Sequence, residues 1–78
     1  MDSTEKLKLI REQIDVLDNQ IRQLLIERRE LAESAKKYKK VVVDEEREKM
    51  IIEKSVFYGE WLGEIYKVII NECRKAQL

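Results

Sequence analysis

Basic residues stand at intervals along the first half of the chain, where they could together bind an anion. Arg28 occupies a position at which an apolar residue is expected, and Arg11 and Lys39 fall on nearly the same side of a predicted helix. Along a straight helix, Arg28 would lie roughly 25 Å from Arg11 and roughly 16 Å from Lys39. Arg28 and Lys39 could therefore reach one small ligand, whereas Arg11 of the same helix could not.

Two further groups of polar side chains are spaced for a common site. Asp44, Arg47 and Glu48 fall within one predicted helical turn, where Arg47 adds a cation and Glu48 an acceptor for a hydroxyl group. Cys73 and Gln77 are four residues apart and share one face of a later predicted helix. Each group also has a plain structural explanation. The first can be a capping turn with solvated charges, and the second a small core residue followed by a solvated amide.

A long apolar seam predicts the helix that carries Arg28. Apolar residues recur every three or four positions from Leu7 to Tyr38, and neither Gly nor Pro interrupts them. Arg28 falls on this seam, where a buried charge needs an anionic partner because an unpaired one is costly to desolvate. That partner is either Glu27 or Glu30 of a neighbouring helix, which would fix the register, or an anionic ligand.

The chain is predicted to be all-α, a single domain over residues 1–78 with one long N-terminal helix and two shorter ones. Gly59 is expected to separate the last two helices, and 41–43 to form an extended connector. The predicted helices span about 4–40, about 45–58 and about 60–77.

The length of the first helix predicts an intertwined antiparallel homodimer. A helix roughly 50 Å long cannot be wrapped by the rest of so short a chain, so its seam is expected to meet a second copy. If the two copies cross near residues 19 and 20, Arg11 of one chain comes opposite Arg28 of the other. Two symmetric cationic pockets would follow.

The overall composition excludes several classes of function. Sixteen basic and sixteen acidic residues cancel, so neither nucleic acid nor an anionic membrane is an expected partner. No apolar run approaches the ~20 residues of a membrane-spanning helix, the first residues do not resemble a signal peptide, and the single Cys73 is typical of a reducing cytoplasm. The chain has no His, which removes the commonest general base and the commonest metal ligand, so no metal site is expected.

Four motifs follow one another in order along the chain. They are IREQIDVLD at 10–18, LLIERRELA at 24–32, DEEREK at 44–49 and VIINECRKAQ at 68–77. The first two resemble the first helix of the all-helical, type II chorismate mutases, and Lys39 stands at that family's lysine spacing from Arg28. The third is similar to the Asp-x-x-Arg-Glu turn that opens the family's second helix, and the fourth resembles its third helix.

The resemblance implies a three-helix protomer that dimerises through its long first helix. It also implies a cofactor-independent isomerase that converts chorismate to prephenate, on the route to phenylalanine and tyrosine. By matching position, Arg28 and the partner's Arg11 resemble the clamps on the two carboxylates of the substrate. Lys39 resembles the residue that bridges a carboxylate and the ether oxygen, and Gln77 the second donor to that oxygen.

The remaining site residues are also implied by matching position. Arg47 resembles the arginine of the family's second helix, and Glu48 resembles the acceptor for the ring hydroxyl, with Asp44 beside it. Cys73 replaces the family's usual serine, which weakens a hydrogen bond to carboxylate because a thiol is a poor donor.

Two other functions fit parts of this pattern. An isochorismate-pyruvate lyase has the same fold, but Glu48 argues against it because that subfamily usually lacks an acidic residue after the arginine of the second helix. A non-catalytic helical dimerisation module would need the apolar seam alone. The reaction product separates the first alternative from a mutase, and the absence of turnover would identify the second.

Overall fold

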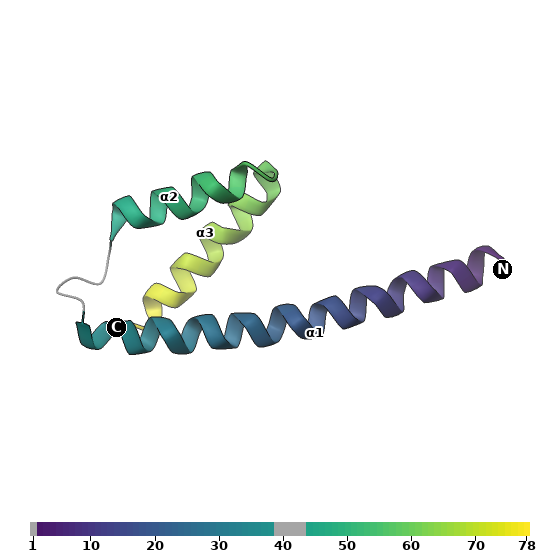
Figure 1. Cartoon of the computed structure of the whole chain (residues 1–78), viewed down its shortest axis with the longest axis horizontal. Helices are drawn as coiled ribbons and strands as arrows, with labels where there is room; N and C mark the ends of the chain where they lie inside the picture. The colour runs from purple at the N-terminus through teal and green to yellow at the C-terminus, as the bar shows by residue number, and fades with distance from the viewer. Residues whose placement is uncertain (1, 39–43) are drawn as a thin grey trace.

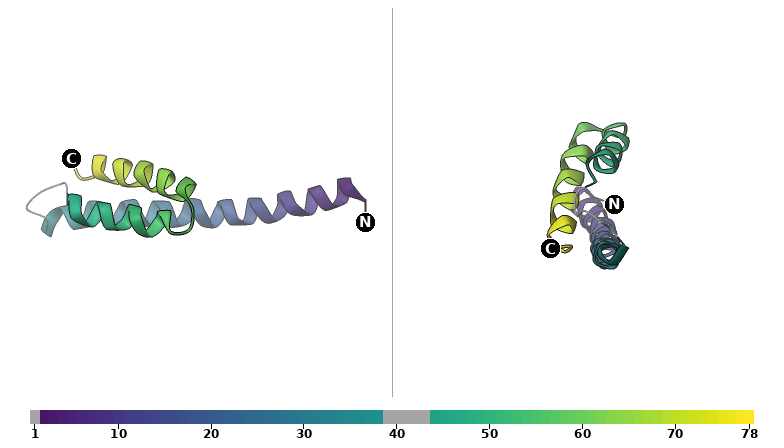
Figure 2. Two further views of the ribbon diagram at one scale, coloured as in Figure 1. Left: turned by 90° about the horizontal axis from the view of Figure 1, so that it is seen from above. Right: turned by 90° about the vertical axis from the view of Figure 1, so that its left-hand side faces the viewer.

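The computed structural model describes residues 2–38 and 44–78, which form a long helix and a helical hairpin. Figure 1 shows α2 and α3 as a hairpin beside the C-terminal half of α1, and the left-hand view of Figure 2 also leaves the N-terminal half of α1 uncovered. The described residues contain no strand, so the predicted all-α class with one long and two shorter helices is confirmed. The elements are α1 (Ser3–Ala35), η1 (Lys36–Tyr38), α2 (Glu45–Val56) and α3 (Glu60–Lys75).

The long helix α1 has a defined start and an early end. Asp2 caps it, because its carboxylate accepts a hydrogen bond from the backbone N–H of Glu5 at 2.8 Å. The α-helical geometry stops at Ala35, and one tighter 3-10 turn follows, whereas the sequence predicted one helix to about residue 40. The predicted connector at 41–43 and the predicted site residue Lys39 lie outside the described residues.

Two glycines shape the hairpin of α2 and α3. Gly59 precedes α3 with a φ of 146°, a backbone conformation that residues with a Cβ rarely adopt. Gly63 is buried in the first turns of α3, where an added Cβ would lie only 2.4 Å from Cγ2 of Val56. The absence of a side chain at Gly63 therefore lets α3 approach the end of α2 closely.

The described part of the chain has a thin core. Ile70 and Cys73 are its buried apolar residues, Ser55 and Gln77 its buried polar ones, and no described side chain is fully enclosed. Helix α3 packs against both α2 and α1, so it joins the hairpin to the long helix. No helix in the described ranges is long and apolar enough to cross a membrane.

The apolar seam of α1 lies largely exposed in the single chain, which measures 57 Å along its longest axis. Even Leu31, beside the hairpin, keeps 70% of its surface exposed. The other exposed large apolar residues of α1 are Leu7, Leu9, Ile10, Ile14, Val16, Leu17, Ile21, Leu24, Leu25 and Ile26.

Candidate functional site

A cavity of about 270 Å³ lies where the C-terminal half of α1 meets the start of α2 and the end of α3. Its apolar wall comes from all three helices, and its polar groups include five residues that the sequence predicted for the site. The lining residues are Arg28, Leu31, Ala32, Ala35, Arg47, Glu48, Ile51, Ile70, Cys73, Arg74 and Gln77. The structure thus brings Arg28, Arg47, Glu48, Cys73 and Gln77 together.

Arg28 enters the cavity from α1 and is half-buried. Its Nη1 donates a hydrogen bond to Sγ of Cys73 on α3, at 2.9 Å. Sulfur is a weak acceptor, so this contact satisfies little of the hydrogen-bonding capacity of a guanidinium with five N–H donors. Among the ion pairs of the described residues, none includes Arg28, and neither Glu27 nor Glu30 of this chain neutralises it.

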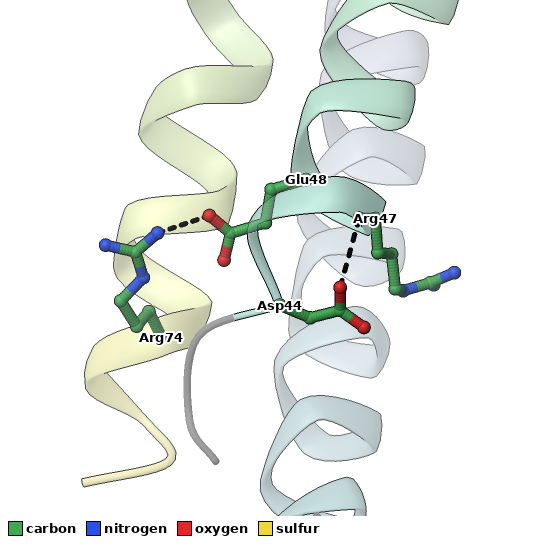
Figure 3. Close-up of polar contacts among 4 residues, drawn as sticks. All are labelled: Asp44, Arg47, Glu48 and Arg74. Carbon is green, nitrogen blue, oxygen red and sulfur yellow. Dashed lines mark hydrogen bonds and ion pairs between the residues drawn. The ribbon is translucent and has the colours of Figure 1, made fainter.

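Glu48 is joined to Arg74, a residue that the sequence analysis did not single out. Nη2 of Arg74 on α3 donates to Oε1 of Glu48 on α2, as the dashed line on the left of Figure 3 shows. The side chain of Arg74 is only 36% exposed, and that of Glu48 only 20%. Arg74 lies at helical spacing from Ile70 and Gln77, so the buried face of α3 was the sequence signal that could have found it.

The predicted group of Asp44, Arg47 and Glu48 divides in the structure. The carboxylate of Asp44 accepts from the backbone N–H of Arg47 at 3.1 Å and caps α2. Asp44 is absent from the cavity lining and borders a second hollow along α2 with Met50 and Lys54. Arg47 lines both hollows, and in Figure 3 its side chain extends away from Glu48. The capping explanation therefore accounts for the geometry of Asp44.

Gln77 follows the end of α3 and is buried, with 7% of its surface exposed. Its Nε2 donates to the backbone oxygen of Ala32 at 3.0 Å, which fixes the end of the chain to α1. Nζ of Lys36 also donates to the backbone oxygen of Leu78 at 3.3 Å. Gln77 therefore presents an amide at the cavity from an anchored segment.

Arg11 is remote from the cavity of its own chain. It lies on the uncovered half of α1, is exposed, and does not line the cavity. Its distance along the helix from Arg28 is roughly 25 Å. Arg11 could therefore act at such a cavity only in another chain.

The cavity is positively charged, although the whole chain has no net charge. Three arginines against one glutamate leave a net charge of plus two on its lining. Guanidinium groups can bind carboxylates through two parallel hydrogen bonds, and Glu48 supplies an acceptor. In the described ranges, no three His, Cys, Asp or Glu side chains gather as metal ligands would. The arrangement suits a small dianion that also carries a hydroxyl group.

Comparison with known proteins identifies one matching family. The family model for chorismate mutase type II matches residues 10–78, which include α2, α3 and all but the first turns of α1. No curated protein and no solved structure matches the chain. The matched range contains every residue predicted for the site, from Arg11 to Gln77.

Proposed function

Because the chain belongs to the type II chorismate mutase family, whose members are isomerases that act on chorismate, we propose that its cavity rearranges chorismate to prephenate. The observation that carries this proposal is the placement of three arginines and Glu48 around one small cavity. Its volume of about 270 Å³ is close to the lower end of ligand pockets, about 300–1,000 Å³. That size suits a small substrate.

The charges of the lining support the binding of a dicarboxylate. Chorismate carries two carboxylates, and the cavity offers Arg28 and Arg47 beside the pair of Glu48 with Arg74. Among the residues that the structure describes, Arg28 donates only to the thiol of Cys73. A carboxylate would give it a stronger, charge-assisted hydrogen bond, which favours binding of the substrate at this residue.

The proposed reaction needs few chemical groups from the protein. In a [3,3]-sigmatropic shift, one C–O bond breaks and one C–C bond forms within the same molecule, so no nucleophile or leaving group is involved. Holding the flexible substrate in its reactive conformation lowers the entropic part of the barrier. Negative charge grows on the ether oxygen as the C–O bond breaks, and donors placed there stabilise the transition state. We assign that role to Lys39 and Gln77.

The same proposal includes a homodimer that completes each site. The exposed seam of α1 supports it, because contiguous apolar surface of this extent is typical of an interface. Leu24 is 63% exposed and would be covered by a second copy of α1. Antiparallel crossing would bring the partner's Arg11 to the cavity that contains Arg28, as a further clamp on a carboxylate.

The test is a spectroscopic assay of chorismate consumption with identification of the product. Prephenate is expected, whereas salicylate with pyruvate would instead identify a lyase. Arg28→Ala should reduce turnover to near the uncatalysed rate while the helical content persists. Arg29→Ala is the matched control, because Arg29 is the adjacent, exposed arginine of α1 and does not line the cavity. Wild-type turnover by Arg28→Ala would contradict the assignment of the site.

A further inference from the structure

Arg74 contributes a charge to the cavity for which the proposed reaction has no assigned role. Its ion pair with Glu48 joins α3 to α2 across 26 positions of the sequence. The other ion pairs in the described residues connect neighbours within one helix, and their side chains are all more than half exposed. Among the ion pairs of the described residues, the pair of Arg74 and Glu48 is thus the one that is both partly buried and directed at the cavity.

The surroundings of Arg74 restrict its motion. Its Nε is fully enclosed and has no hydrogen-bond partner in the described residues. An arginine enclosed at Nε cannot move as freely as a solvated surface arginine, so its Nη2 is held in place. Within the described ranges that nitrogen donates only to Oε1 of Glu48, and Figure 3 shows the second carboxylate oxygen without a bonded neighbour among the residues drawn.

We propose that Arg74 is a positioning residue that orients Glu48 to accept a hydrogen bond from the ring hydroxyl of the substrate. This inference rests on the proposed function. A free glutamate side chain loses rotamer entropy when it is ordered on binding, and a carboxylate already held by Arg74 avoids much of that loss. Arg74 also offsets the charge of Glu48, which would otherwise repel the carboxylates of a dianionic substrate.

The experiment compares Arg74→Met with the wild-type chain on two substrates. One is chorismate, and the other is its analogue with hydrogen in place of the ring hydroxyl. For chorismate, kcat/KM should fall by about tenfold or more, mainly through a higher KM. The reason is that a displaced Glu48 would bind and orient the ring hydroxyl of the substrate less well. For the analogue, the fall in kcat/KM should be several times smaller than for chorismate. Arg74→Lys should recover much of the loss, since one donor suffices for the single contact with Oε1.

A matched control is available on the same helix. Lys75 pairs with Glu72 at 2.9 Å, on exposed surface away from the cavity. Lys75→Met also removes one cation of α3 and its ion pair with a glutamate, here on exposed surface, and the kcat/KM for both substrates should stay at the wild-type value. Circular dichroism verifies folding, and Arg74→Gln replaces Arg74→Met in the comparison if the methionine variant is unfolded.

If the wild-type chain converts chorismate, two results would each overturn the role of Arg74 without overturning the proposed function. One is an unchanged kcat/KM in Arg74→Met. The other is an equal loss on both substrates, which would mean that Arg74 only joins α3 to α2. An inactive wild-type chain would instead overturn the proposed function, and this inference with it.

Discussion

Mixing two inactive variants tests whether each site takes residues from two chains. Arg28 lines the cavity of its own chain, whereas Arg11 lies roughly 25 Å away along the same helix. We expect Arg11→Ala and Arg28→Ala each to be nearly inactive alone. A mixed dimer would contain one site with both arginines intact and one site that lacks both.

The expected recovery follows from counting sites. After unfolding and refolding an equimolar mixture, about half of the dimers should be mixed, and one of their two sites should be intact. About one quarter of wild-type activity should therefore return. The assay is chorismate consumption before and after the exchange of subunits, with the fraction of mixed dimers measured by mass spectrometry.

A second mixture provides the control for this recovery. Arg28 and Arg47 line the same cavity of one chain, so a mixed dimer of Arg28→Ala and Arg47→Ala would have a defect in both sites. No activity should return from that pair. Failure of Arg11→Ala and Arg28→Ala to recover activity, with mixed dimers present, would refute the shared site.

The remaining predictions concern folding and assembly. Gly63→Ala should lower the unfolding free energy by about 1–3 kcal/mol, because its Cβ would lie 2.4 Å from Val56, and Val56→Ala in the same chain should restore part of the loss in thermal denaturation. Asp44→Ala should cost about 1 kcal/mol in urea unfolding, since it removes the cap of α2, and kcat should change far less than in Arg28→Ala. Leu24→Lys should convert the dimer to monomer in sedimentation velocity, because a charge would enter the seam; an unchanged sedimentation coefficient would contradict the seam as the interface.

The sequence predicted the features that depend on helical periodicity. The run of apolar residues at three- and four-residue spacing located α1, and it marked Arg28 as a charge out of place on that helix. The same spacing placed Cys73 and Gln77 on one face of the last predicted helix, and both line the cavity, although α3 ends at Lys75. The assembly of α1 with a second copy stays a prediction.

Other features depend on how the helices cross, which local spacing does not define. Arg74 looks like an ordinary charged residue in the sequence, and only the packing of α3 on α2 brings it to Glu48. Gly63 lies inside α3 and permits its close approach to Val56, a contact that the spacing of residues along the helix does not predict. Asp44 had two explanations from sequence, and its bond to the backbone of Arg47 supports capping. The role of Lys39 stays a prediction, because that residue lies outside the described ranges.

The uncovered seam of α1 has a thermodynamic consequence. No described side chain is fully enclosed, so the chain alone gains little hydrophobic stabilisation, and in the proposed homodimer most of it would come from association with the second chain. Folding and association of that homodimer would then form a single equilibrium, and its melting temperature would rise with protein concentration. Dilution alone would unfold such a chain and remove its activity, so the abundance of the protein itself would set the fraction that is active.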